Sequence, residues 1–180
     1  VNVLPFDLSL PVEALLKEHF TGITEVHGLI NNAGYLEQGA TETLSIEAYH
    51  RCMQTNFFGP VALIQWLFPL LNAGKAHVVN ISTMGAFQGS VKFPGLSAYA
   101  ASKAAITNFT EVFAEEQKDT GIRMNCLCLG AVNTEMLRDA FPGYVAPVSA
   151  EEMGAYIAEF TLRSGLVFNG KILPVSSSTP

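Results

Sequence analysis

Apolar residues along this chain fall into short uninterrupted runs, separated by longer stretches with helical spacing. Short runs rich in valine, isoleucine and leucine and bounded by turn residues are typical of buried strands. Such runs occur at 1–6, 26–30, 76–82, 122–129 and 171–175. Because helical stretches alternate with these runs, the pattern predicts an α/β fold, a parallel sheet with helices on both faces.

The helical stretches begin at residues that suit helix starts. The predicted helices cover 11–20, 45–72, 99–117 and a segment that begins at Ser149. Pro11 suits a first helical turn, and Ser45 or a neighbouring residue caps the second helix. Gly59-Pro60 predicts a kink within that second helix. Ser149 and Glu152 have the spacing of a capping box, which predicts that the last helix begins directly after Ser149.

The composition indicates one apolar domain. The 180 residues form a single domain over 1–180, with 49% hydrophobic and 14% charged residues and a mean hydropathy of +0.28. Strands covered by helices on both faces explain part of this apolar excess. Helix surfaces hidden between subunits would explain the rest, so we expect a homo-oligomer, either a dimer or a tetramer.

The net charge and the residue composition argue against several classes of binding partner. The net charge of −6, without a cluster of lysine and arginine, argues against a nucleic-acid partner. The longest apolar stretch, 60–71, is too short to span a bilayer, and no signal peptide is recognisable, so no membrane partner is expected. Cys52, Cys126 and Cys128 predict buried free thiols and a cytoplasmic location. The scattered histidines predict no metal site.

Tyr99 and Lys103 stand one helical turn apart in the third predicted helix. A phenol is a poor base near neutral pH, since its pKa is about 10. A nearby ammonium stabilises the phenolate and lowers that pKa, so the pair can exchange a proton with an alcohol or a carbonyl oxygen. The alternative is a half-buried tyrosine beside a solvated lysine with no chemistry, which is the common meaning of this spacing when it stands alone.

The surrounding motifs decide between these interpretations. In chain order they are Asp7, the NNAG turn at 31–34, Asn56, the strand VNIST at 79–83, Tyr99 with Lys103, and the loop LGAVNT at 129–134. This order resembles the short-chain dehydrogenase/reductase family over nearly the whole chain. The resemblance implies a Rossmann-like doubly wound parallel sheet. Ligands bind at the carboxyl ends of the strands in such sheets, and three of these motifs follow predicted strands.

The resemblance also implies an oxidoreductase that transfers a hydride between NAD or NADP and a small carbonyl or secondary alcohol substrate. Tyr99 would be the general acid in reduction and the base in oxidation, and Lys103 would lower its pKa and bind the nicotinamide ribose. Asn56 would hold a water in the proton relay, or else serve only as a polar plug at the helix kink. The residues implied in cofactor binding are Asp7, Asn32, Ala33, Gly34, Tyr99, Lys103, Gly130, Val132 and Thr134.

The catalytic hydroxyl has two candidates, Ser82 and Thr83. Successive strand residues point to opposite faces, so only one of them faces the substrate. An ungapped comparison with the family favours Thr83, whose hydroxyl donates as serine does but whose methyl crowds the site. Two further departures are a slightly long segment between Thr83 and Tyr99, and Leu129 where the family prefers proline.

The family's glycine-rich phosphate-binding loop, of the TGxxxGxG type, is not in this sequence. In the family it joins the first strand to the first helix, so the first two strands and first helix are expected to be missing from the sheet. We expect the natural protein to be longer, the edge of the 26–30 strand to be exposed, and the 180 residues alone to bind cofactor poorly. The alternative function is a non-catalytic dinucleotide-binding protein or scaffold on the same fold.

Overall fold

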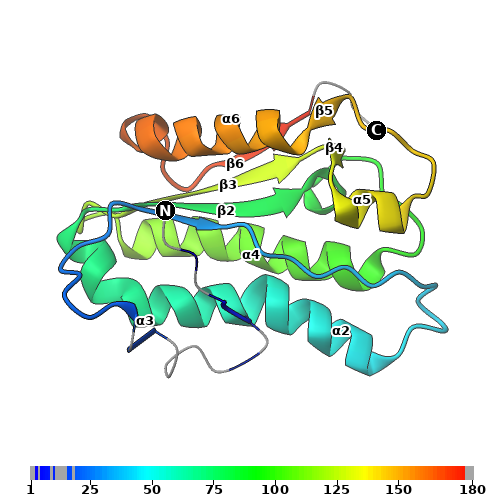
Figure 1. Cartoon of the computed structure of the whole chain (residues 1–180), viewed down its shortest axis with the longest axis horizontal. Coiled ribbons are helices and arrows are strands. Elements are labelled where there is room, and N and C mark those ends of the chain that lie inside the picture. Colours follow the sequence, from blue (N-terminus) through cyan, green and yellow to red (C-terminus); the bar gives the residue numbers. More distant parts are fainter. Residues whose placement is uncertain (1–2, 4, 9, 11–15, 18, 177–180) are drawn as a thin grey trace.

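The structure is a computed structural model, and it describes residues 3, 5–8, 10, 16–17 and 19–176. Its centre is a four-stranded parallel sheet in the order β1-β2-β3-β6 (Figure 1). The strands are β1 (Gly28–Asn31), β2 (His77–Thr83), β3 (Arg123–Leu129) and β6 (Ile172–Val175). Each coincides with a predicted strand, so the predicted α/β fold with a parallel sheet is confirmed.

Helices cover both faces of this sheet. Helix α6 (Ala150–Arg163) lies on one face, and α4 (Ser97–Glu116) lies on the other, on the same side as α2 (Ile46–Met53) and α3 (Gly59–Ala73) (Figure 1). The shorter elements are η1 (Gln54–Phe58), η2 (Met84–Ala86), β4 (Val132–Asn133), α5 (Glu135–Ala140), β5 (Val148–Ser149) and η3 (Ser164–Leu166). Strands β4 and β5 pair with each other in a separate two-stranded sheet.

The core has a layer on each side of the sheet, and β2 contributes to both. Val78 packs with Ile64 and Leu71 of α3, whereas its neighbour Val79 packs with Ile157 of α6. Side chains alternate between the two faces of a strand, and both faces of β2 are covered by helices. This double burial explains why the strands are continuous apolar runs rather than alternating ones.

Two predicted helix starts are confirmed by their hydrogen bonds. Ser45 Oγ accepts a hydrogen bond from the Ala48 N–H at 3.2 Å. At α6, Ser149 Oγ accepts from the Glu152 N–H at 3.1 Å, and Glu152 Oε2 accepts from the Ser149 N–H at 3.0 Å. The second pair is the reciprocal capping box expected from the sequence.

The helical run is irregular next to the predicted kink at Gly59-Pro60, and whether it bends there stays a prediction. The helical run from α2 to α3 is interrupted by the π-helical segment η1, which ends directly before Gly59. Pro60 has no N–H, so no regular α-helical bond can form from it to the Asn56 carbonyl four residues earlier. The helix widens over the turn that contains Asn56, and π-helical turns of this kind are frequent at functional sites.

The predicted strand at 1–6 is wrong for the residues that the structure describes. Val3, Pro5 and Phe6 have no strand pairing, and Pro5 lacks the N–H that a ladder requires. The segment instead lies beside α3, because Leu8 packs against Leu63 and Trp66. Of the helix predicted at 11–20, residues 16, 17 and 19 are helical, while 11–15 and 18 lie outside the described residues.

Strand β1 forms one edge of the sheet, and Ile30 in it is 38% exposed, as predicted for this strand. The three cysteines are buried and form no disulfide, which confirms the prediction of free thiols. Among the helices of the described part of the chain, none combines the length and the apolarity needed to cross a bilayer.

His77 is a buried histidine at the amino-terminal end of β2, 6% exposed. Its Nδ1 donates to the Thr161 carbonyl at 2.8 Å, and its Nε2 accepts from the Asn125 amide at 2.9 Å, which is the pattern of a neutral ring. Burial lowers the pKa of His77 below its usual value, and the bond to Thr161 offsets this in part. Protonation of Nε2 would set an N–H against the Asn125 N–H.

We expect the free energy of unfolding to fall as the pH drops below about 6.5, the usual histidine pKa. In this range the unfolded chain binds a proton on His77 that the folded chain does not, so acid favours the unfolded chain. The slope from this residue is at most about 1.4 kcal/mol per pH unit. Urea titrations from pH 7 to acid would measure it. In His77→Asn, which keeps a donor but cannot titrate, this part of the slope should vanish, and an unchanged slope would contradict the assignment.

Candidate active site

The candidate site lies where β2 ends and α4 begins. Helix α4 carries Tyr99 and Lys103 in its first two turns, and Thr83 is the last residue of β2. Tyr99 and Thr83 line one pocket of about 300 Å³, which we call the Thr83–Tyr99 pocket. The structure therefore brings together two residues that the sequence placed in different motifs, at the carboxyl edge of a parallel sheet where ligands are expected.

Lys103 is almost fully buried, at 4% exposure. Its Nζ donates to the Ile81 carbonyl at 2.9 Å, which uses one of its three N–H donors. Burial lowers the pKa of Lys103 to about 8, since the charged form is the one that burial disfavours. A Cβ added at Gly34 would lie 3.4 Å from this Nζ, so the NNAG turn approaches the ammonium closely because residue 34 has no side chain.

The expectation that Lys103 lowers the pKa of Tyr99 is not met. Burial raises the pKa of Tyr99 to about 12, and Cys52 adds a smaller contribution in the same direction. The Lys103 ammonium, which donates to the Ile81 carbonyl, does not offset this rise. The phenol is therefore protonated near neutral pH.

Ser82 and Thr83 face different surroundings. The Ser82 hydroxyl is buried and donates to the Lys103 carbonyl at 3.0 Å, within the core. Thr83 is half-buried, and its Oγ1 accepts from the Gly85 N–H at 3.2 Å. That bond leaves the Thr83 O–H free to donate elsewhere, and only Thr83 of the two lines the pocket with Tyr99. The geometry favours Thr83 as the active hydroxyl.

Asn56 is buried in η1 at 1% exposure, and its side chain joins three segments. Its Oδ1 accepts from the Tyr35 N–H, and its Nδ2 donates to the Tyr35 carbonyl and to Ser102 Oγ, each at 2.8 Å. Ser102 Oγ donates in turn to the Tyr99 carbonyl at 2.7 Å. Both amide N–H groups are thus used within the protein. The side chain fastens the NNAG turn to α4, and the predicted role in holding a water stays a prediction.

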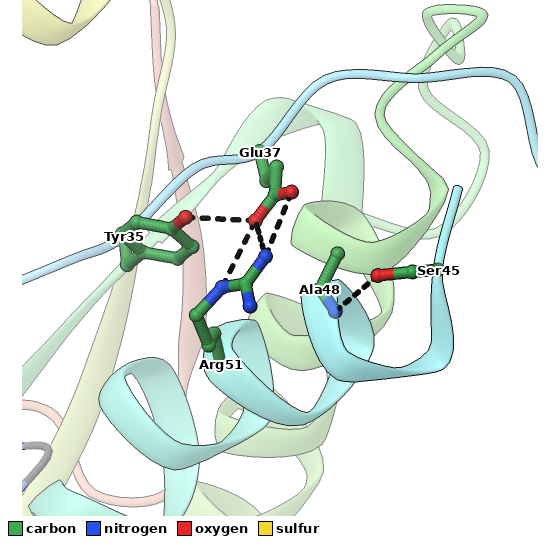
Figure 2. Close-up of polar contacts among 5 residues, drawn as sticks. All are labelled: Tyr35, Glu37, Ser45, Ala48 and Arg51. Atoms are coloured by element: carbon green, nitrogen blue, oxygen red, sulfur yellow. Dashed lines mark hydrogen bonds and ion pairs between the residues drawn. The ribbon is translucent and has the colours of Figure 1, made fainter. Parts of the chain in front are cut away.

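A second attachment of the same loop was not foreseen from the sequence (Figure 2). Arg51 of α2 holds Glu37 through two nitrogens, with Nη2–Oε2 at 2.7 Å and Nε–Oε2 at 3.2 Å, and the Tyr35 hydroxyl donates to Glu37 Oε2 at 2.7 Å. The Arg51 guanidinium lowers the pKa of Glu37, and the bond to Glu37 raises that of Tyr35. Such an exposed pair stabilises little, so its main effect is to fix the loop against α2.

The sequence of this chain is similar to those of known proteins. The sequence profile described as short chain dehydrogenase matches residues 3–144. This chain belongs to that family. Human 11-beta-hydroxysteroid dehydrogenase type 2 is 35% identical over 136 residues, which cover 75% of this chain and 32% of that protein. Rat dehydrogenase/reductase SDR family member 7B is 34% identical over 137 residues, covering 74% and 41%. The chain thus spans about a third to two fifths of the length of these relatives.

A solved structure supports the fold. The ligand-free aldohexose dehydrogenase of Thermoplasma acidophilum superposes with a TM-score of 0.84, over 96% of this chain and 76% of that one. At 23% identity this likeness establishes the Rossmann-like fold alone. Dehydrogenases of the family use NAD or NADP as cofactor.

The residues present suit the nicotinamide end of such a cofactor. The buried Lys103 ammonium has N–H donors beyond the one bonded to Ile81. It also lies close to the backbone of Gly34 in the NNAG turn. Within that turn, Asn32 and Ala33 are exposed at the same edge of the sheet. Lys103 would hold ribose hydroxyls there. The glycine-rich loop that would hold the phosphates is not in this sequence.

The other residues implied in cofactor binding lie in two further places. Gly130 donates its N–H to the Val175 carbonyl at 2.9 Å, and Val132 pairs with Val148 between β4 and β5. Thr134 caps α5, its Oγ1 accepting from the Leu137 N–H at 3.2 Å. Asp7 is exposed on the segment beside η1 and α3. Their predicted contacts with cofactor stay predictions.

Proposed function

We propose that the protein is an NAD- or NADP-dependent oxidoreductase that interconverts a carbonyl and a secondary alcohol. The observation that carries this proposal is the Thr83–Tyr99 pocket, which both hydroxyl-bearing residues line, with the buried Lys103 one turn further along α4. A non-catalytic binding protein or scaffold would have no use for this arrangement, so that alternative is not favoured. The names of the relatives, which include 11-beta-hydroxysteroid dehydrogenase and estradiol 17-beta-dehydrogenase, support an apolar alcohol such as a steroid as the substrate class.

The residues would act in sequence around the substrate oxygen. Thr83 Oγ1, held by the Gly85 N–H, would donate a hydrogen bond that fixes the carbonyl oxygen and stabilises the charge developing on it. Tyr99 would transfer its phenolic proton to that oxygen. Lys103, one turn along α4, would bind the ribose hydroxyls of the nicotinamide with the N–H groups that Ile81 does not use. The bound nicotinamide supplies or accepts the hydride.

The proposal is tested with the intact protein that carries this sequence. Purified protein is mixed with NADH or NADPH and a panel of ketosteroids, and the loss of reduced cofactor is followed by absorbance. We expect loss that depends on both protein and ketone, and the reverse reaction with the matching alcohol. No turnover in either direction with either cofactor, for protein that binds the cofactor, would overturn the proposal.

Removing the hydroxyl of Thr83 and removing that of its neighbour Ser82 should affect kcat differently. Thr83→Val removes the hydroxyl that lines the pocket and keeps the shape, so kcat should fall roughly 10²- to 10³-fold, as for other single oxyanion donors. Ser82→Ala removes a hydroxyl bonded to the Lys103 carbonyl in the core, so its effect on kcat should be much smaller. Steady-state kinetics on both variants would measure the contrast. A larger loss for Ser82→Ala would show that Ser82 is the active hydroxyl.

A further inference from the structure

The segment between Thr83 and Tyr99 forms a wall of the Thr83–Tyr99 pocket, and hydrogen bonds within the segment hold it in shape. Ser90 Oγ donates to the Phe87 carbonyl at 2.8 Å and contacts the Met84 carbonyl. Lys92 Nζ donates to the same Phe87 carbonyl at 2.6 Å and to Ser90 Oγ at 2.9 Å. Lys92 is therefore fixed in position along its own loop, and it lines the pocket.

No carboxylate in the described part of the chain forms an ion pair with Lys92. Its two acceptors, a backbone carbonyl and a hydroxyl, are uncharged, and an ammonium has a third N–H donor beyond them. The residues that line the pocket in the described part of the chain include no aspartate or glutamate. Among the described residues that line the pocket, Lys92 is therefore the one charged side chain.

The rest of this wall is apolar. Phe93, Pro94 and Leu96 line the pocket beside Lys92, between it and Tyr99 in sequence. The Phe93 ring also contacts the Phe141 ring, edge to face, with centroids 6.3 Å apart. Phe141 follows α5, so the apolar wall continues onto the loop after that helix. This lining suits a ligand with an apolar body beside Phe93 and an acceptor group beside Lys92.

We propose that Lys92 is a specificity-determining residue that selects substrates carrying a carboxylate at a distance from the reacting carbonyl. This inference rests on the proposed function, and it narrows the substrate class to apolar keto acids and the corresponding hydroxy acids. The carboxylate accepts the third N–H of Lys92 and neutralises its charge, while the carbonyl lies at Thr83 and Tyr99. Because the contact is remote from the reacting carbon and equal in the ground state and the transition state, it lowers KM rather than raising kcat.

The test compares a keto acid with its own methyl ester on the intact protein. A partly exposed charge pair contributes modestly, so wild type should show a KM about 5-fold lower for the acid than for the ester. Lys92→Met should bring this ratio close to one, and Lys92→Arg should keep it. Lys171→Met is the matched control, since it removes an exposed lysine at the opposite end of the sheet, just before β6, and should keep the preference. The preference should also weaken at high salt.

Equilibrium binding of both compounds, measured by calorimetry, separates this inference from the proposed function. Equal KM and equal affinity for acid and ester in wild type, or a preference that survives Lys92→Met, would overturn the role of Lys92. If the acid binds more tightly in a Lys92-dependent way but neither compound is turned over with NADH or NADPH, the role of Lys92 stands. In that case the proposed reaction fails.

Discussion

Replacing Tyr99 with phenylalanine should lower kcat of the intact protein roughly 10²- to 10⁴-fold, the usual contribution of a general acid or base. The substitution deletes the phenolic oxygen and leaves the ring, so the pocket wall and the start of α4 should keep their shape. The phenol has a pKa raised to about 12 by burial, so near neutral pH it is present as the acid that reduction requires. Oxidation needs the phenolate, so its rate should rise with pH.

Kinetics of both directions across pH would measure these effects. Tyr156→Phe is the matched control, because Tyr156 is a half-exposed tyrosine on α6 and its substitution removes the same atom far from α4. It should leave kcat near the wild-type value. If Tyr99→Phe retained most of the activity while folding normally, proton transfer by Tyr99 would be excluded.

Lys103→Met should make the protein more stable and less active. The pKa of Lys103 is lowered to about 8 from an ordinary value of about 10.5, which corresponds to about 3 kcal/mol of unfavourable burial at neutral pH. Methionine fills a similar volume without a charge, but the hydrogen bond to the Ile81 carbonyl is lost, at about 1 kcal/mol. The net expectation is a gain of about 2 kcal/mol in the free energy of unfolding, together with a loss of turnover.

The pH dependence gives this prediction a second readout. Between pH 8 and about 10.5 the unfolded chain holds a proton on Lys103 that the folded chain has released, so wild-type stability should rise with pH across this window. Lys103→Met should lack that rise, whereas Lys171→Met, at an exposed position, should behave as wild type. Denaturant titrations at several pH values would show it. A less stable Lys103→Met protein at pH 7 would contradict the account.

The higher free energy of unfolding expected for Lys103→Met means that lysine is an unfavourable residue for packing at this position. An ammonium buried between β2 and α4 is unfavourable for folding, and residues of this kind concentrate at functional sites. Cys126 lies near enough to affect Lys103, but burial is the larger influence on its pKa. A lysine at this position is expected if it serves the proposed reaction.

The sequence predicts the central strands and the main helices well, because their signals are local. Continuous apolar runs such as the one that became β2, and the capping box at Ser149, need only a few neighbouring residues to be recognised. Two features were missed. The described residues of the β-prone segment at 1–6 have no strand pairing, because a strand also needs a neighbouring strand, which a local pattern does not reveal. The helical run is π-helical over the turn of Asn56, directly before Gly59 and Pro60, and Pro60 lacks the N–H of a regular helix.

The site was predicted less completely than the fold, because side-chain orientation depends on contacts distant in sequence. Motif order identified Tyr99 and Lys103, but nothing in the spacing showed that the Lys103 ammonium would bond to Ile81. The attachment of Glu37 to Arg51 joins a loop to a helix, and Lys92 matters only through the pocket it lines. A charged residue in a longer than usual segment beside the active site was the one available signal for Lys92.

The most direct test of the central claim, that these residues assist hydride transfer to a carbonyl, follows the hydrogen atom itself. The intact protein is supplied with an apolar ketone and with NADH or NADPH in which both hydrogens on the reducing carbon of the nicotinamide are deuterium, and the product is analysed by mass spectrometry. The account predicts an alcohol that carries deuterium on the former carbonyl carbon, formed by wild type and almost absent with Tyr99→Phe. Alcohol without deuterium, or no alcohol from protein that binds cofactor and ketone, would contradict it.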